Sequence, residues 1–317
     1  MRTYDYVTAD VFTDRQFGGN QLAVLLDARD LSSEQMLDIA REFNYSETTF
    51  VLPPERGGAA KVRIFTPGGE VPFAGHPTIG TAHVLFATGA LTADGTEATI
   101  LLEEQVGDVP VKVRLPHAAV GAGVEPTFAQ LSVAQLPEER EAPSRALLAD
   151  ALGLREDDIL DGAYAPRMAG CGLPFVLVPL ASHDAVRRAR VRHEAWERAL
   201  PPDAWTREPM VFAMGAPDEA SARAGVDVHA RVFVPGLSVP EDPATGSANA
   251  ALAGYLAART PRLDGTLRWV VAQGIEMGRP SRLELEADKQ GGEITAVRVG
   301  GSAVVVSEGR LRLRPRA

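Results

Sequence analysis

Cysteine and long apolar runs are almost missing from this chain of 317 residues. Its single cysteine, Cys171, cannot form an intrachain disulfide, which fits a reducing compartment. There is no apolar run of about 18 residues, the length that a membrane-spanning helix needs. The N-terminus also lacks the apolar core of a signal peptide. We therefore expect a cytoplasmic protein without a membrane partner.

Positive charge is in deficit. Lys and Arg number 32 against 42 Asp and Glu, so the formal net charge is −10. Binding to nucleic acid backbones needs a basic footprint, and no nucleic-acid partner is expected. Hydrophobic residues make up 45% of the chain and charged residues 23%, which is ordinary for a folded protein. At roughly 150 residues per domain, the length suggests about two domains.

Several familiar catalytic motifs are absent as well. The sequence has no P-loop, no H-E-x-x-H, no G-x-S-x-G and no G-x-G-x-x-G after a strand. Cys171 has no activating partner near it in sequence, so we interpret it as structural. His76 and His83 could share a helix face, but no carboxylate or cysteine completes a ligand set. No metal site is expected.

Short apolar segments between turns are abundant. Gly and Pro total 53 residues, near 17% of the chain, where about 12% is usual. Predicted strands cover 6–12, 21–26, 48–52, 61–65, 99–103, 109–115, 175–178, 210–214, 228–234, 267–273, 282–287, 293–299, 303–307 and 310–313. Glu308-Gly309 between the last two is a hairpin signal.

Helical patterns are fewer. Predicted helices cover 32–43, with Ser33 as a possible N-cap, and 78–87, 143–152, 182–200 and 245–259. The Arg-rich stretch 187–192 lies on the fourth of these, close to Asp184 and Glu194, and we interpret it as a solvated helix face. The sequence therefore predicts a strand-rich α+β chain.

One segment is repeated within the chain. Residues 63–72, RIFTPGGEVP, align without gaps to 231–240, RVFVPGLSVP, with six of ten positions identical. Each copy reads as a strand, a Pro-Gly turn, an X-Pro step and a small-residue helix. We infer two pseudo-equivalent halves, each with one such unit inside a larger sheet.

Proline is favoured at the first position of a helix, so His76-Pro77 and Asp242-Pro243 are plausible helix starts. Helix N-termini expose free N–H groups that attract anions, and two of them facing each other would bind a carboxylate. Gly75 and Gly246 would let a ligand approach the backbone. Ordinary capping without any ligand explains the same pattern.

Polar residues at these helix starts are candidates for chemistry. They are His76, Asp242, Thr245 and Ser247. Histidine is the usual proton-transfer group near neutral pH, whereas Asp242 could orient a substrate or only cap its helix. Glu47 lies between a predicted helix and the apolar strand that follows it. Partial desolvation there would raise its pKa and make it a general acid/base; an ordinary turn glutamate is the alternative.

The chain resembles the phenazine-biosynthesis isomerase family (PhzF-like proteins), which has the diaminopimelate epimerase-like fold. The matching stretches span nearly the whole chain in the expected order: DVFT at 10–13 with GGN at 18–20, NYSETTF at 44–50, RIFTP at 63–67, PFAGHPTIG at 72–80, EDPATGSA at 241–248 and GRPS at 278–281.

The resemblance implies two similar halves, each a curled, mostly antiparallel sheet around a central helix, with the active site between them. We expect the N-terminal half over 1–118, completed by 303–317, and the C-terminal half over 119–302. The resemblance also implies a homodimer that needs no metal or organic cofactor and takes a small anionic, carboxylated substrate. The family's phenazine enzyme isomerises trans-2,3-dihydro-3-hydroxyanthranilate. Carried over, Glu47 would be the general acid/base.

In the same family scheme, His76, Asp242 and Ser247 would bind the amine, carboxylate and hydroxyl of such a substrate. The related racemases use two facing cysteines, which one cysteine cannot provide. An epimerase with another base and a non-catalytic ligand-binding protein of the same fold stay open as alternatives. The sequence names no physiological substrate, and the Arg-rich stretch matches no motif of the family.

Overall fold

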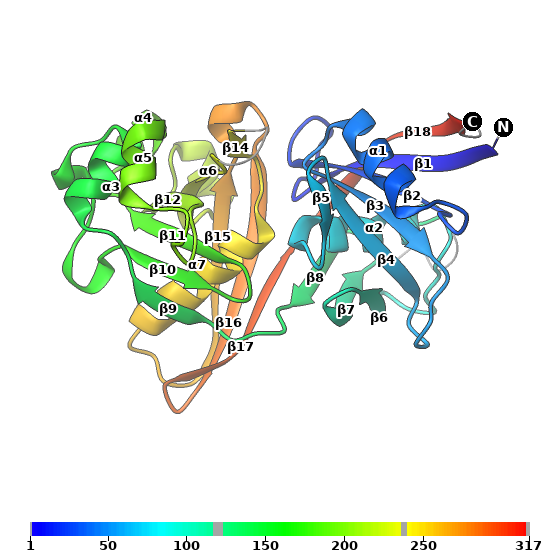
Figure 1. The fold of residues 1–317 in the computed structure, drawn as a ribbon. Coiled ribbons are helices and arrows are strands. Elements are labelled where there is room, and N and C mark those ends of the chain that lie inside the picture. Colours follow the sequence, from blue (N-terminus) through cyan, green and yellow to red (C-terminus); the bar gives the residue numbers. More distant parts are fainter. Residues whose placement is uncertain (1, 117–122, 236–239, 315–317) are drawn as a thin grey trace. The chain divides into compact units, whose positions relative to one another are not determined.

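A computed structural model describes residues 2–116, 123–235 and 240–314 of the chain, which is drawn in Figure 1. The chain divides into two compact units. Unit 1 comprises residues 1–132 and 300–317, and unit 2 comprises residues 133–299. The boundary expected at 118/119 falls outside the described residues, whereas the change of unit lies at 132/133.

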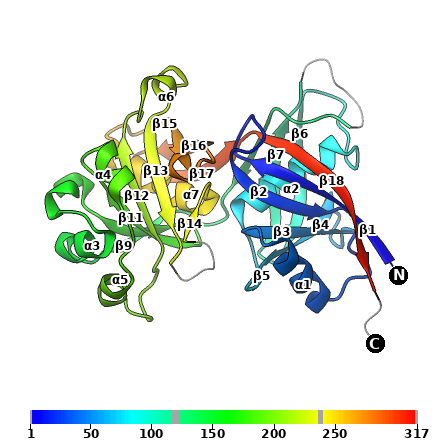
Figure 2. The ribbon, with the colours of Figure 1, turned by 90° about the horizontal axis from the view of Figure 1, so that it is seen from above.

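In the described residues, unit 1 contains two helices of more than ten residues and nine strands. Its elements are β1 (Arg2–Val11), β2 (Asn20–Leu25), α1 (Ser33–Phe43), β3 (Glu47–Leu52), β4 (Ala60–Thr66), β5 (Gly69–Val71), α2 (Gly75–Ala87), β6 (Glu97–Glu104), β7 (Gly107–Arg114), β8 (Phe128–Ser132) and β18 (Ala303–Leu313). Figures 1 and 2 show β18, in red, lying beside β1, in blue. The last strand of the chain therefore completes the sheet that the first strand begins.

Unit 2 is built from the intervening residues. Its elements are β9 (Glu138–Glu141), α3 (Arg145–Leu152), β10 (Arg167–Gly170), β11 (Pro174–Pro179), α4 (His183–Arg188), α5 (His193–Ala199), β12 (Pro209–Met214), α6 (Glu219–Arg223), β13 (Val228–Phe233), β14 (Glu241–Asp242), α7 (Gly246–Arg259), β15 (Gly265–Gln273), β16 (Ser281–Gln290) and β17 (Glu293–Gly301). Three 3₁₀ turns lie at Glu156–Asp158, Gly162–Tyr164 and Ile275–Met277. The last two residues of β17 belong to unit 1.

The two units repeat one pairing scheme. In unit 1, β18, β1 and β2 are antiparallel neighbours, β2 and β3 are parallel, β3 and β4 antiparallel, β4 also pairs with β5 and β6, and β6 pairs with β7. In unit 2, β9 to β16 repeat these pairings in the same order and with the same directions. The predicted pseudo-equivalent halves are confirmed.

A central helix fills each sheet. Helix α2 contacts strands β1, β2, β3, β6, β7, β8 and β18, and twelve of its thirteen residues are buried. Helix α7 contacts β10, β11, β15 and β16 and is buried along nearly all its length. A helix that is apolar all round must be enclosed on all sides, which is why each mostly antiparallel sheet curls around it. The expected α+β fold class is thus confirmed.

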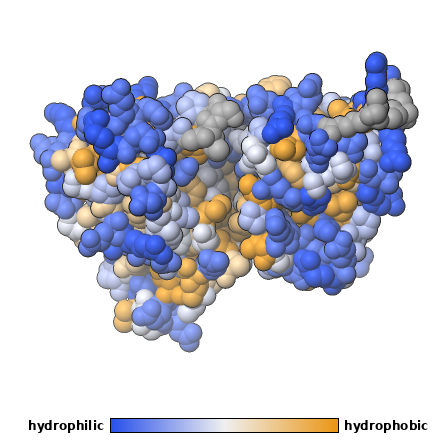
Figure 3. Space-filling model, in the orientation of Figure 1, coloured by the Kyte–Doolittle hydropathy of each residue, from blue (hydrophilic) through white to orange (hydrophobic). Residues whose placement is uncertain are grey.

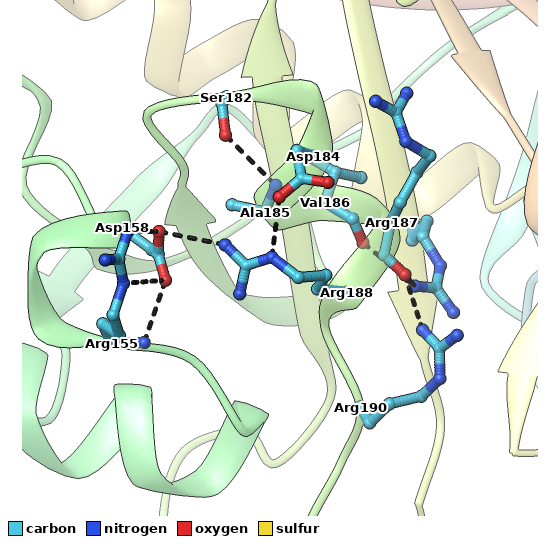
Figure 4. A network of polar contacts seen from close by, with 10 residues as sticks. Arg155, Asp158, Ser182, Asp184, Ala185, Val186, Arg187, Arg188 and Arg190 are labelled. Atoms are coloured by element: carbon cyan, nitrogen blue, oxygen red, sulfur yellow. Dashed lines mark hydrogen bonds and ion pairs between the residues drawn. The ribbon is translucent and has the colours of Figure 1, made fainter.

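The predicted helix over 182–200 is wrong: two short helices, α4 and α5, occupy this range. The backbone between α4 and α5 is not helical, because Arg190 and Arg192 donate their backbone N–H groups to the carbonyls of Leu152 and Ala151 at the end of α3. The four arginines of the stretch 187–192 are exposed. Arg188 donates to Asp184 at 2.7 Å and to Asp158 at 3.1 Å, and both contacts are drawn as dashed lines in Figure 4.

Two other elements, α1 and β18, also differ from the prediction. The N-cap of α1 is Ser32, whose side chain accepts from Gln35, and not Ser33. The predicted hairpin at Glu308-Gly309 is wrong, since β18 runs through it as one strand. Gly309 lies opposite Tyr6, and a Cβ atom there would stand 2.5 Å from the Tyr6 ring. The glycine therefore makes room for a cross-strand ring and does not form a turn.

The surface agrees with this arrangement of buried helices. On the face seen in Figure 3, hydrophilic residues cover most of the outer surface of each unit, with hydrophobic residues in smaller groups. Among the described residues, no helix has the length and apolar character to cross a bilayer. Many hydrophobic residues are buried in the cores of the two units.

Candidate active site

In unit 1, the structure brings the predicted base and the predicted histidine together. Glu47 is the first residue of β3, and His76 is the second residue of α2. The Glu47 Oε2 and His76 Nε2 atoms are 3.5 Å apart, with side chains 18% and 5% exposed. Asn20, at the start of β2, places its Nδ2 atom 3.3 Å from His76 Nδ1. Glu47 therefore lies at the edge of a polar cluster that is mostly closed to water.

Burial keeps the His76 ring uncharged. Loss of hydration lowers the pKa of His76 to about 3, against a smaller opposing effect of a backbone hydrogen bond with Gln21. At neutral pH its contact with Glu47 is therefore not an ion pair. A neutral imidazole has one donor and one acceptor nitrogen. His76 can thus face either a carboxylate or a carboxylic acid at Glu47, depending on which nitrogen holds its proton.

A second buried histidine, His83, makes stability depend on pH. Burial lowers its pKa to about 4, below the ordinary 6.5. An unfolded chain would bind this proton below pH 6.5 and the folded chain would not, so stability falls as the pH drops from about 6.5 to 4. We expect His83→Leu to reduce this acid-induced loss in the free energy of unfolding by about 2–3 kcal/mol. Urea unfolding at pH 7 and pH 4.5 measures the effect.

The matched control for His83 is His193→Gln, because the His193 side chain on α5 is 74% exposed. The control should leave the acid dependence as it is in the wild type. Equal acid dependence in His83→Leu and the wild type would contradict the expectation.

In unit 2, Asp242 and Thr245 form a second polar cluster. Thr245 Oγ1 donates to Asp242 Oδ2 at 2.5 Å. Gln273, fully buried at the end of β15, donates from Nε2 to the Asp242 carbonyl at 2.8 Å and to Thr245 Oγ1 at 3.1 Å. Gln273 Oε1 accepts from Thr245 N at 3.3 Å and from Asn249 Nδ2 at 2.9 Å. The Asp242–Thr245 turn is therefore held rigidly by one amide.

The expected helix starts are shifted. Helix α7 begins at Gly246, so the prediction of a helix start at Asp242-Pro243 is wrong: Asp242 ends β14, which pairs with β13. Helix α2 begins at Gly75, two residues before Pro77. With Gly75 and Gly246 as equivalents, at an offset of 171 residues (246 − 75), His76 corresponds to Ser247. The gapless alignment at an offset of 168 holds for β4 and β13, whereas β5 and β14 already correspond at an offset of 171 (242 − 71).

Both central helices start without a side-chain cap. The N-cap residues are Ala74 in α2 and Thr245 in α7, and neither side chain accepts from its helix. By contrast, serine or aspartate side chains cap α1, α3, α4 and α6. The Thr245 hydroxyl instead donates to Asp242 and accepts from Gln273 Nε2. The first N–H groups of α2 and α7 thus keep the character that attracts anions.

The predicted site residues fall into two groups. Glu47, Gly75 and His76 belong to unit 1, and Asp242, Thr245, Gly246 and Ser247 belong to unit 2. One site made from both groups stays a prediction. The sequence did not single out Asn20, Asn249 and Gln273 as site residues. The available signal was weak: an asparagine after two glycines and a glutamine ending an apolar strand.

The single cysteine contacts helix α7. The Cys171 thiol donates to the Ala250 carbonyl at 3.6 Å. Burial raises the pKa of Cys171 to about 12, so it stays a thiol at neutral pH. Within residues 2–116, 123–235 and 240–314, no three His, Cys, Asp or Glu side chains gather as a metal-binding group.

Comparison with known proteins identifies the relatives of this chain. The family model of phenazine biosynthesis-like proteins matches residues 9–309. The chain belongs to this family. An uncharacterised isomerase from Mesorhizobium japonicum is 40% identical over 98% of this chain and 99% of its own length. The trans-2,3-dihydro-3-hydroxyanthranilate isomerase of Pseudomonas aeruginosa is 36% identical over 97% of this chain and 99% of its own length.

A solved structure agrees with the assignment to the phenazine biosynthesis-like family. The PhzF-family phenazine biosynthesis protein of Bacillus anthracis superposes with a TM-score of 0.85 at 26% identity, over 99% of this chain and 100% of that protein. The expected resemblance is therefore confirmed over nearly the whole length. Together with the names of the relatives, it makes this protein an isomerase of the family.

Proposed function

We propose that this protein is a cofactor-independent isomerase that moves a proton on a small, carboxylated, cyclic substrate. The observation that carries the proposal is the Glu47 carboxyl group, mostly shielded from water and 3.5 Å from a neutral His76. A shielded carboxylate can remove a proton from carbon more readily than a hydrated one. The first substrate to test is trans-2,3-dihydro-3-hydroxyanthranilate, on which the Pseudomonas aeruginosa relative acts by name.

The proposed reaction needs one proton carrier. Glu47 takes a proton from one ring carbon, the electron pair of that C–H bond shifts through the adjacent double bond, and Glu47 returns the proton to another carbon. Atoms and charge balance, because the carboxylate is regenerated. His76 lies 3.5 Å from the Glu47 carboxyl group and, while neutral, adds no charge that would make Glu47 a weaker base.

The second group of residues would bind the substrate. We propose that Asp242 and Ser247 orient its amine and hydroxyl groups, and that the uncapped starts of α2 and α7 attract its carboxylate. Gly75 and Gly246, the first residues of the two helices, would allow close approach to the backbone. The absence of side-chain caps at these two helices supports this assignment. The site between the units, the homodimer and the cytoplasmic location belong to the same proposal.

Incubation in heavy water tests the reaction. The purified protein is mixed with trans-2,3-dihydro-3-hydroxyanthranilate and a panel of hydroxylated cyclic amino acids. We expect deuterium to appear at a new ring carbon together with movement of the double bond, as followed by NMR and mass spectrometry. Exchange with inversion at one carbon and no double-bond movement would instead indicate an epimerase. Binding without exchange for every substrate would contradict the proposal.

A further inference from the structure

A small hydrogen-bond network, the helix-start device, links the first turn of each central helix to the end of a neighbouring strand. In unit 2, Asn249 is the fourth residue of α7, and its Nδ2 atom donates to the Thr245 carbonyl at 3.0 Å and to Gln273 Oε1 at 2.9 Å. Gln273 is the last residue of β15. The device therefore ties the helix start to the end of the neighbouring strand.

Unit 1 repeats this device with different side chains. Thr78 is the fourth residue of α2, and its Oγ1 atom is 2.8 Å from the Ala74 carbonyl and 2.6 Å from Glu104 Oε1. Glu104 is the last residue of β6, which occupies the place of β15 in the repeated pairing scheme. Thr78 thus corresponds to Asn249, and Glu104 to Gln273.

The number of protons decides the chemistry of the unit 1 device. An amide nitrogen carries two protons, so Asn249 can donate to both of its acceptors. A hydroxyl carries one, so Thr78 cannot donate both to Ala74 and to an ionised Glu104. If Glu104 is protonated, its O–H donates to Thr78 Oγ1 and Thr78 donates to the Ala74 carbonyl. Both hydrogen bonds of the Thr78 hydroxyl group can form at the same time only if Glu104 carries this additional proton.

The surroundings of Glu104 favour the same protonated form. Its side chain is buried, and in the described part of the chain its Oε2 atom has no hydrogen-bond partner. Burial raises the pKa of Glu104 to about 8, and the Thr78 hydroxyl opposes this shift only in part. An ionised carboxylate with one unsatisfied oxygen would be costly here.

The described ionisable groups on the neighbouring elements do not supply a compensating positive charge: on β4, Lys61 pairs with Glu55 and Arg63 with Glu70. On α2, His76 and His83 are neutral at pH 7, because burial lowers the pKa of each to about 3 and about 4. The next residue on β6, Glu103, accepts instead from the backbone N–H groups of Glu55, Arg56 and Gly58. The charged residues of β7 pair elsewhere: Asp108 with Arg56, Lys112 and Arg114 with Glu97.

We propose that Glu104 is a carboxylic acid in the working protein, and that Glu104 and Gln273 are matched positioning residues for the helix turns carrying His76 and Ser247. The role in positioning rests on the proposed function, whereas the protonation of Glu104 does not. When Glu104 loses its proton, the Thr78 hydroxyl must turn towards the carboxylate and release the Ala74 carbonyl. The first turn of α2, and His76 with it, then loses a constraint.

Infrared spectroscopy tests the proton directly. We expect the wild type to show the carbonyl band of a protonated carboxylic acid at pH 7 that disappears at alkaline pH. The Glu104→Gln variant should lack this band, and the Glu42→Gln variant, which changes an exposed glutamate, should keep it. If the spectra of wild type and Glu104→Gln show the same acid band at pH 7, the proposed protonation is wrong.

Stability measurements give a second readout that does not depend on turnover. The pKa of Glu104 in the folded chain, about 8, lies above its ordinary value of 4.5. Its contribution to stability is therefore complete below pH 4.5, is lost as the pH rises to about 8, and is constant above that. The melting temperature of Glu104→Gln relative to the wild type should rise across this window by at least about 3 °C. A constant difference would also contradict protonation.

Kinetics tests the positioning role. Glu104→Gln copies the amide of unit 2 and should keep kcat at pH 7 while removing the loss of activity at alkaline pH that we expect for the wild type. Glu104→Leu has similar volume without the hydrogen bond and should lower kcat about 10–100-fold. Thr78→Ser should retain activity that Thr78→Val loses. Unchanged pH profiles in all four folded variants would overturn the positioning role even if the infrared band is present.

The two proposals fail in different ways. If no substrate turns over, or if Glu47→Gln keeps full turnover, the proposed function is wrong, and the infrared and melting data still decide whether Glu104 is protonated. If turnover needs Glu47 but the acid band of Glu104 is missing, the function stands and the present inference is wrong.

Discussion

Replacing Glu47 by Gln should reduce turnover at least about 100-fold, within the range by which general acid–base groups accelerate reactions. Glutamine keeps the size of the side chain and can still contact His76, whose Nε2 atom is 3.5 Å from Glu47 Oε2. It cannot accept a proton from carbon. The measurement is kcat on the panel substrate that exchanges deuterium most rapidly, together with the rate of that exchange. Substrate affinity should change much less than kcat.

A matched variant separates this effect from general damage to the fold. Glu42→Gln makes the same chemical change on an exposed residue of α1, five positions earlier, and should leave kcat at the wild-type value. Both variants should unfold at temperatures close to that of the wild type. The mechanism would be wrong if turnover and deuterium exchange in Glu47→Gln were within about tenfold of the values for the control.

The second large effect concerns Arg231, the buried arginine of the internal repeat. Its guanidinium group pairs with both oxygens of Glu241 at 2.8 Å and donates to the carbonyls of Val186, Arg187 and Ala189. The side chains of Arg231 and Glu241 are 4% and 13% exposed. Removing one partner of a buried ion pair leaves an uncompensated charge. We therefore expect Arg231→Met to destabilise the protein by about 3–5 kcal/mol.

The repeat itself supplies the control for Arg231. Arg63 occupies the same place in β4, pairs with both oxygens of Glu70 at 2.7 and 2.6 Å, and lies over the ring of Phe65 as Arg231 lies over Phe233. Its pair is more exposed, at 22% and 30%. Arg63→Met should cost only about 1 kcal/mol or less, because water can solvate what remains.

Urea unfolding of both arginine variants measures the difference. The midpoint for Arg231→Met should fall well below that for Arg63→Met, with an unchanged slope. Losses of stability that agree within about 1 kcal/mol would mean that burial does not separate the two pairs. The two sites share the two-pronged ion pair and the contact with a phenylalanine ring, and they differ in exposure and in the backbone carbonyls that Arg231 also contacts.

The Arg231–Glu241 pair also explains how Asp242 is positioned. Glu241 and Asp242 are the only two residues of β14, and successive side chains of a strand point to opposite faces. Glu241 is held by Arg231, while Asp242 is held by Thr245 and by Gln273. Loss of Arg231 should therefore disturb the proposed substrate-binding group as well as stability.

The sequence by itself determined the composition of the fold and the identity of the main candidates. Apolar segments of four to eight residues between glycines and prolines predict strands, because burial of alternate or continuous apolar faces depends mostly on local pattern. The repeat of 63–72 at 231–240 predicts two equivalent halves, and the sequence also points to Glu47 and His76, whose side chains lie 3.5 Å apart in the structure.

Only the tertiary structure decided where elements begin, end and connect. The segment at Arg190 and Arg192 is not helical, because its backbone N–H groups donate to carbonyls at the end of α3. Gly309 continues a strand, because the Tyr6 ring lies opposite it. The equivalence of Thr78 with Asn249 and of Glu104 with Gln273 is likewise invisible in the sequence, since the residues differ in type. Long-range contacts set these features, and a local pattern contains no information about a partner more than twenty residues away.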